Sequence, residues 1–169
     1  DERFVMFLGD NVIQGGISPL MVAVTNASYE LAAALIEWGA DVNDHWMGFT
    51  ALHQVIWSHH PPVSFHPPGP EVKGKMGNVD AMTLEKMLLD WGADPNVGQF
   101  KRHPMGYKLG QVGEYEGLTP LMLAARFEDV ELMRLLLAYG ADPKMVMDNN
   151  TNLLMVAAVV AARIAAAGI

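Results

Sequence analysis

The stretch that decides the fold is Leu35-Ile36-Glu37-Trp38-Gly39-Ala40-Asp41-Val42-Asn43, because it recurs twice more along the chain. The second copy is Leu88-Leu89-Asp90-Trp91-Gly92-Ala93-Asp94-Pro95-Asn96, and the third is Leu136-Leu137-Ala138-Tyr139-Gly140-Ala141-Asp142-Pro143. Glycine follows the last turn of a helix readily, because it adopts the left-handed conformation without strain. The Asp and Asn residues after it favour tight turns. Each copy therefore predicts the end of a helix followed by a turn.

A second motif opens each repeating unit. It occurs as Ser18-Pro19-Leu20-Met21, Thr50-Ala51-Leu52-His53, Thr119-Pro120-Leu121-Met122 and, more weakly, Asn152-Leu153-Leu154-Met155. Ser or Thr before Pro is typical of a helix N-cap with Pro at the first helical position. Between the two motifs, apolar residues at helical spacing indicate a second helix: Leu31, Leu35 and Ile36; Leu84, Met87 and Leu88; Leu132, Leu135 and Leu136. The predicted unit is helix, turn, helix and loop.

Together these motifs resemble the ankyrin repeat, which opens with Gly-x-Ser/Thr-Pro/Ala-Leu and ends with Gly-Ala-Asp-Val/Pro-Asn. The resemblance covers nearly the whole chain and implies an all-α ankyrin-repeat solenoid with three full repeats. These are residues 16–47, 48–116 and 117–148, with partial repeats at 1–15 and 149–169. The run Phe4-Val5-Met6-Phe7-Leu8 is predicted to be the tail of an earlier second helix. The resemblance also implies that the imidazole of His53 bonds to the hydroxyl of Thr50.

The second repeat carries two insertions. Leu20 and Leu35 are 15 residues apart, but Leu52 and Leu88 are 36 apart, which places an insertion near 59–78. It contains Pro61, Pro62, Pro67, Pro68 and Pro70, so we expect an extended arm. The other insertion falls near 97–116, in the loop between repeats. Long loops in compact domains are usually either functional or disordered.

Composition excludes several classes of protein. Hydrophobic residues make up 51% of the 169-residue chain, which argues against disorder. A net charge of −8 argues against nucleic-acid binding, which needs clustered Lys and Arg. The apolar run at 153–169 is too short and too interrupted by Arg163 for a membrane span. The chain has no Cys, and it looks closest to bacterial ankyrin proteins with long insertions, many of them exported, so a location outside the bacterial cytoplasm is favoured.

No motif for catalysis is visible. The sequence lacks a nucleophile elbow and a Gly-rich phosphate loop, so we expect a non-catalytic protein without a cofactor. His59, His60 and His66 share one loop and make a metal-binding loop an alternative. Zinc needs three or four converging ligands, and adjacent histidines on a Pro-rich loop chelate poorly. We therefore expect exposed loop histidines.

The candidate partner-binding residues follow from the resemblance. In ankyrin proteins, partners commonly dock on the concave face, on the residue before the opening Ser/Thr and on those ending the first helix. Carried onto this chain, these positions are Ile17, Phe49 and Leu118, then Thr25-Asn26, Trp57-Ser58 and Arg126-Phe127. Phe49, Trp57, Arg126 and Phe127 are of types enriched at interfaces. The alternative is that Trp57 and Phe127 pack under the insertions.

Secondary candidates are Trp38, Trp91 and Tyr139, which share one repeat position, and Phe100 and Tyr107 in the second insertion. The first three could instead cover the ends of the second helices.

The predicted function is therefore a module that binds a protein partner through its concave face, loops and insertions. The alternative is a permanent structural subunit of a larger assembly, because repeat arrays need polar caps and neither end of the sequence reads as one. The identity of the partner does not follow from the sequence.

Overall fold

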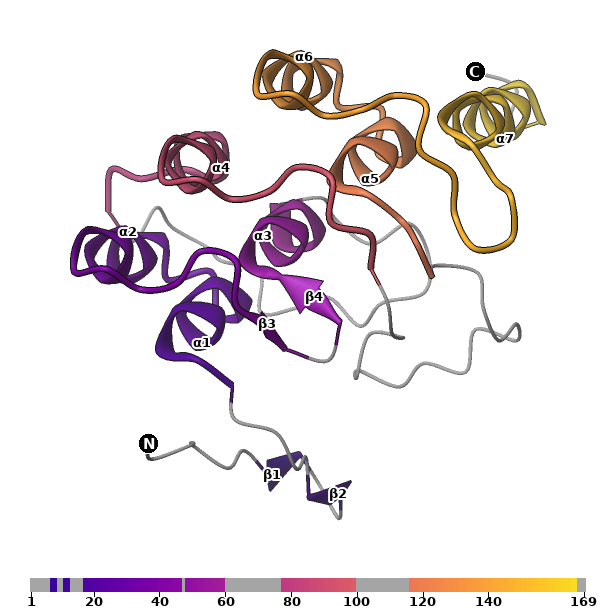
Figure 1. The fold of residues 1–169 in the computed structure, drawn as a ribbon. Helices are drawn as coiled ribbons and strands as arrows, with labels where there is room; N and C mark the ends of the chain where they lie inside the picture. Colours follow the sequence, from indigo (N-terminus) through magenta and orange to yellow (C-terminus); the bar gives the residue numbers. More distant parts are fainter. Residues whose placement is uncertain are drawn as a thin grey trace.

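The chain folds as a stack of helix pairs, as the computed structural model shows for residues 7–8, 11–12, 17–46, 48–59, 77–99 and 116–166. The pairs are α1 (Pro19–Thr25) with α2 (Tyr29–Glu37), α3 (Ala51–His59) with α4 (Ala81–Asp90), and α5 (Pro120–Arg126) with α6 (Val130–Ala138). A further helix, α7 (Leu153–Ala166), packs on α5. The first helices α1, α3, α5 and α7 form one layer and the second helices α2, α4 and α6 form the other (Figure 1). The predicted all-α solenoid is confirmed.

The helix boundaries follow from the two sequence motifs. The hydroxyl oxygens of Ser18 and Thr119 accept hydrogen bonds from the backbone N–H of Met21 (3.2 Å) and Met122 (3.3 Å). Pro then occupies the first helical position, where its missing N–H leaves no bond unmade.

At the other end of each unit the glycine ends the second helix. Gly39 has a φ of +89°, and its N–H donates to Ile36 while the N–H of Ala40 donates to Leu35. This pair of bonds satisfies carbonyls that the helix end would leave unpaired. A Cβ at this position would touch nothing, so the backbone conformation, and not a lack of space, favours glycine.

Asparagine side chains join the turns of successive repeats. The amide of Asn43 donates to the carbonyl oxygen of Gly92 (2.9 Å) and its Oδ1 accepts from the N–H of Asp94 (2.8 Å). Asn96 makes the same two bonds one repeat further on, to Gly140 (3.0 Å) and Asp142 (2.7 Å). Each turn is thereby held to the next by a side chain that both donates and accepts.

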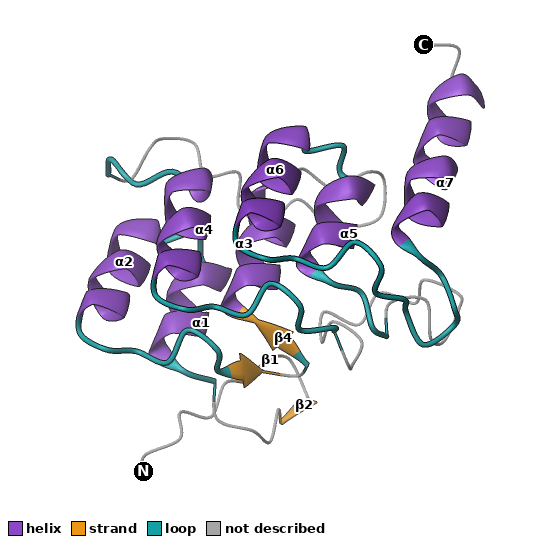
Figure 2. Cartoon of the chain, turned by 45° about the horizontal axis from the view of Figure 1, so that its top comes forward, coloured by secondary structure: helices purple, strands orange, loops and turns teal. Residues whose placement is uncertain are grey.

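Short strands form two hairpins. β3 (His45–Trp46) pairs antiparallel with β4 (Phe49–Thr50) in the loop between the first two repeats (Figure 1), and Figure 2 shows β4 among the helices by its strand colour. β1 (Phe7–Leu8) pairs antiparallel with β2 (Asn11–Val12). The prediction that Phe7 and Leu8 end a second helix is therefore wrong. A short apolar run has no period that separates helix from strand, and Phe is common in strands.

The core lies between the two layers. The leucine of each opening motif is buried in the three full repeats: Leu20, Leu52 and Leu121 are at most 1% exposed. Leu154 in α7, at the same repeat position, is 78% exposed. No helix of the described segments has the length and apolar character that crossing a bilayer requires.

The two chain segments that flank the second insertion lie side by side. Gln99 and Leu118 form an isolated antiparallel bridge, in which the N–H of Gln99 donates to the carbonyl oxygen of Leu118 (2.9 Å). Most of the two insertions, including Phe100, Tyr107, His60 and His66, lies outside the described residues.

Candidate functional site

The C-terminal ends of the first helices lie next to one another in the stack, since α1 contacts α3 and α3 contacts α5. They carry five of the predicted partner-binding residues, which we call the helix-end surface: Asn26, Trp57, Ser58, Arg126 and Phe127. Asn26 and Ser58 are exposed, and the other three are half-buried. The structure thus brings residues that are 101 positions apart in sequence (26 to 127) to one edge.

The centre of the helix-end surface is an aromatic pair. The rings of Trp57 and Phe127 meet edge to face, with centroids 5.4 Å apart and planes at 84°. This is the geometry that aromatic rings prefer, because the positive edge of one ring faces the negative face of the other. The pair joins the second repeat to the third.

Polar contacts flank the aromatic pair. The hydroxyls of Tyr29 and Ser58 are 3.0 Å apart, which ties the start of α2 to the end of α3. Ser58 also donates to the carbonyl oxygen of Val55 (2.9 Å), and the Asn26 amide donates to that of Val22 (3.0 Å). These bonds fix the directions of side chains that the sequence alone leaves free.

Three predicted docking residues are buried. Ile17 is 4% exposed, Phe49 1% and Leu118 2%, so the expectation that they lie on an accessible face is wrong for the isolated chain. Ile17 packs with Met21 and Trp46. Phe49 belongs to β4 and its ring packs edge-on against His53, with centroids 6.4 Å apart. Their burial removes apolar surface from water, which favours the folded state.

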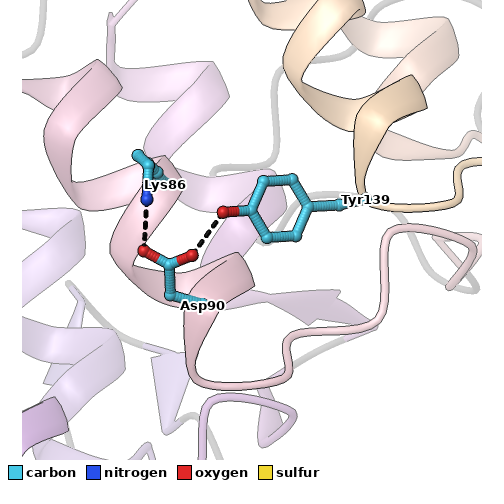
Figure 3. Close-up of polar contacts among 3 residues, drawn as sticks. All are labelled: Lys86, Asp90 and Tyr139. Atoms are coloured by element: carbon cyan, nitrogen blue, oxygen red, sulfur yellow. Dashed lines mark hydrogen bonds and ion pairs between the residues drawn. The ribbon is translucent and has the colours of Figure 1, made fainter.

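The second-helix aromatics are more exposed. Trp38 is 78% exposed and Trp91 50%. Tyr139 is half-buried, and its hydroxyl donates to the carboxylate of Asp90, which also pairs with Lys86 four residues earlier (Figure 3). Tyr139 thus covers the end of the neighbouring second helix, as the alternative interpretation of these aromatics proposed, while the two tryptophans present accessible surface.

A buried carboxylate lies beside the helix-end surface. Glu85 of α4 is 0% exposed, and neither carboxylate oxygen has a hydrogen-bond partner among the described residues. Burial raises the pKa of Glu85 to about 8, and the negative charges of Asp129 and Asp80 add to the shift. Burial also raises the pKa of Tyr29, and the negative charge of Glu85 adds to that rise.

Sequence reasoning missed Glu85, although the repeat register contains a signal. Counting back from the terminal glycines, Glu85 occupies the position of Ala32 in the first repeat and Met133 in the third. Ala32 is buried and Met133 half-buried. A charged residue at a position that is apolar in both other repeats marks an exception to the pattern.

The described residues contain no group of three or more His, Asp or Glu side chains placed to hold a metal ion. The side chains of His59, His60 and His66, on which the metal alternative rests, lie outside the described side chains. That alternative stays a prediction, which metal analysis of the purified protein tests.

Two comparisons with known proteins bear on this arrangement. Family models described as ankyrin repeat match residues 15–44 and residues 116–149. These segments hold the first and third helix pairs, and the second pair, with its two insertions, lies between them. A search of the curated proteins finds no match to the chain. The matched segments are similar to ankyrin repeats, and the helix pairs and turns of the described residues form an all-α solenoid of the ankyrin type.

Proposed function

We propose, for a solenoid built from ankyrin repeats, that the protein is a non-catalytic interaction module whose helix-end surface binds a protein partner. Ankyrin repeats generally mediate protein–protein interaction. The proposal assigns the contact to Asn26, Trp57, Ser58, Arg126 and Phe127, and it leaves out the buried Ile17, Phe49 and Leu118.

The observation that carries this proposal is the aromatic pair of Trp57 and Phe127. Trp and Arg are among the residue types that dominate binding energy, particularly where they lie at the centre of a contact and polar groups surround them. Here Arg126 precedes Phe127 directly, and the exposed Ser58 follows Trp57 directly, so polar residues adjoin both rings in the sequence. The pair also comes from two repeats already fixed against each other, so binding orders little additional chain.

The experiment is quantitative capture from the organism's own extract with three full-length proteins. These are the unaltered chain, Trp57→Ala, and Trp91→Ala as a matched control that removes an indole elsewhere. Proteins retained by the unaltered chain and by Trp91→Ala, but lost with Trp57→Ala, support the proposal. Equal retention by all three contradicts it, provided circular dichroism shows that Trp57→Ala is folded.

The direct contact is tested by a photo-crosslinking amino acid at Ser58, with the same amino acid at Lys144 as the control. Both positions are exposed. A crosslinked product at Ser58 that disappears with Phe127→Ala supports docking on the helix-end surface, and products at Lys144 alone contradict it.

One observation favours the second candidate function, a permanent subunit of a larger assembly. Helix α7 exposes Leu154 (78%), Met155 (53%) and Val159 (60%), which is unusual for a protein that is free in solution. A permanent subunit aggregates when it is isolated, whereas a reversible binder is monomeric. Size-exclusion chromatography of the purified chain separates these outcomes. Bacterial origin and export also remain proposals, supported by the resemblance of the long insertions.

A further inference from the structure

The buried carboxyl group of Glu85 is not required by the fold of the repeat. The equivalent positions hold Ala32 and Met133, so apolar side chains fill this place in the other two repeats. Glu85 is 0% exposed, and neither of its carboxylate oxygens has a hydrogen-bond partner among the described residues. A buried polar group without a partner lowers stability. Departures of this kind from the packing pattern are typical of functional sites.

Glu85 lies close to the starts of all three second helices. Its carboxyl group interacts electrostatically with Asp129, which precedes α6, and with Asp80, which precedes α4. It also interacts with the hydroxyl of Tyr29 in α2. That hydroxyl is 3.0 Å from the hydroxyl of Ser58, which belongs to the helix-end surface. The unpartnered carboxyl group therefore lies next to the surface to which the partner is assigned.

The described part of this edge is mostly acidic. The segments that lead into the first turns of the second helices are residues 26–31, 77–83 and 126–132. They contain five acidic residues and one basic residue: Glu30, Asp80, Glu128, Asp129 and Glu131, against Arg126. A surface with this balance attracts positively charged groups of a partner and repels negatively charged ones.

The kind of positively charged group follows from the acceptors and rings present. The two oxygens of Glu85 fit the two parallel N–H donors along one edge of a guanidinium group. A guanidinium is planar and stacks on aromatic rings, which Trp57 and Phe127 supply. A lysine ammonium is a compact, strongly hydrated charge and matches neither feature as well. A metal ion is disfavoured, since the described residues contain no group of three or more His, Asp or Glu side chains placed to hold one.

Pairing requires the Glu85 side chain to turn toward the surface. Among the described residues no hydrogen bond holds its carboxyl group in the buried place, so a change of rotamer breaks none. Such changes are common when an interface forms. Ser58 is exposed, and Tyr29 and Trp57 are half-buried, so the adjoining surface is accessible in part.

We propose that the partner of the helix-end surface presents an arginine side chain, which stacks on Trp57 and pairs with Glu85. This inference rests on the proposed function, because it specifies the chemistry of the partner at the same surface. Glu85 supplies the two oxygens that accept from the guanidinium, and Asp80 and Asp129 add negative charge around it. Glu85 is thereby the residue that selects arginine.

The same pairing links binding to pH. Burial and the charges of Asp129 and Asp80 raise the pKa of Glu85 to about 8, so the isolated chain holds this proton at pH 7. A guanidinium stabilises the carboxylate, so binding releases the proton, and the affinity rises with pH by about tenfold per unit well below pH 8. Tyr29 of α2 has a raised pKa and stays protonated over this range. Helix α3, which packs on α4, carries no acidic residue, and its His53 is neutral there.

The test uses an acetylated peptide with one arginine between alanines, titrated into the ¹⁵N-labelled full-length chain at pH 7. The chain has four tryptophans, and the indole N–H signal of Trp57 is identified in NMR spectra by its loss in Trp57→Phe. We expect a saturable shift of this signal, with those of the exposed Trp38 and Trp91 unchanged. Control peptides carry lysine or citrulline, the neutral analogue of arginine. We expect weaker binding with lysine and none with citrulline.

The role of Glu85 is tested with Glu85→Met, which takes its side chain from the third repeat. We expect this variant to bind the arginine peptide about tenfold or more weakly and to lose the rise in affinity between pH 6 and pH 8. Glu37→Met, at an exposed position of α2, is expected to bind like the unaltered chain. No saturable shift, equal binding of the arginine and citrulline peptides, equal binding by Glu85→Met, or an affinity independent of pH would each overturn the proposal.

Two further results separate this inference from its alternatives. Binding that appears only in the double variant Lys73→Gln, Lys75→Gln would overturn it, because the chain's own lysines would then occupy the site. Capture of partners that is lost with Trp57→Ala but equal for Glu85→Met would overturn it and leave the proposed function intact. Capture that Trp57→Ala does not change contradicts the proposed function itself, and this inference with it.

Discussion

The imidazole of His53 in the second repeat bonds to the carbonyl oxygen of Leu118 in the third, 65 residues later, with Nε2 3.1 Å from that oxygen. Nδ1 of the same ring lies 2.8 Å from the hydroxyl oxygen of Thr50. In the neutral tautomer, Nε2 donates to Leu118 while Nδ1 accepts from Thr50. The Leu118 carbonyl also accepts from Gln99, so one oxygen joins the two edges of the second insertion to α3.

The first prediction concerns this ring. We expect His53→Met to lower the free energy of unfolding by about 1–3 kcal/mol, because Leu118 and Thr50 lose a partner in a buried place. Met is the matched substitution, since Met21 and Met122 occupy the same position in the other repeats and are themselves buried. Urea unfolding at pH 7 measures the change. A stability equal to that of the unaltered chain would show that the inter-repeat bond contributes nothing.

The same residue predicts a dependence of stability on pH. Burial lowers the pKa of His53 to about 4 from the model-peptide value of 6.5. Between these two pH values His53 is protonated in the unfolded chain but neutral in the folded chain. The stabilising contribution of neutral His53 to folding is therefore complete above pH 6.5 and is lost as the pH falls toward 4. We expect this acid-side loss to be absent from His53→Met. Thermal unfolding from pH 4 to pH 7 on both proteins checks it.

Glu85 predicts an opposite dependence at higher pH. Its pKa in the fold, about 8, lies above the ordinary 4.5, so the folded chain binds the extra proton. The contribution of protonated Glu85 to the free energy of unfolding is therefore complete below pH 4.5 and is lost as the pH rises through 8. Since one pKa unit corresponds to about 1.4 kcal/mol, the loss at pH 8 is on the order of a few kcal/mol.

Glu85→Met tests this dependence, because Met133 stands at the same position in the third repeat. We expect the variant to be more stable than the unaltered chain at pH 8 and to vary less between pH 5 and pH 8. Glu37→Met, at an exposed position of α2, is the control for replacing a carboxylate. A variant that is less stable at pH 8 would show that the carboxylate is stabilised in the fold.

The asparagines that join the turns predict that Asn96 and Lys144, at equivalent repeat positions, differ in their effect on stability. Asn96→Ala removes two hydrogen bonds between the second and third repeats, so we expect a loss of about 1–2 kcal/mol. Lys144→Ala, at the next equivalent position, is expected to change stability by less than about 0.5 kcal/mol. Chemical denaturation of both variants measures the difference, and equal effects would contradict the inter-repeat role of Asn96.

The aromatic pair predicts a coupling energy. A double-mutant cycle on Trp57→Ala and Phe127→Ala is expected to give an interaction of about 0.5–1.5 kcal/mol in the free energy of unfolding, because the two rings are in edge-to-face contact. Additive losses would mean that the rings stabilise the fold independently.

Much of the candidate site followed from the repeat register. Trp57, Ser58, Arg126 and Phe127 were placed at helix ends because each opening motif fixes where the first helix lies. Whether those ends are accessible did not follow. Phe49 and Leu118 hold positions where the resemblance implied docking residues, and they are buried. Burial of that kind depends on residues far away in the sequence.

The sequence by itself determined the repeat, its N-caps and the glycines that end its second helices, because these depend on interactions within a few residues. Only the tertiary structure decided which equivalent side chains are covered. Leu31, Leu84 and Leu132 are the same residue at the same repeat position, yet Leu31 alone is half exposed, because among the described residues only the other two follow a helix pair of the stack. The exposure of a side chain in a solenoid therefore depends on its neighbouring repeats.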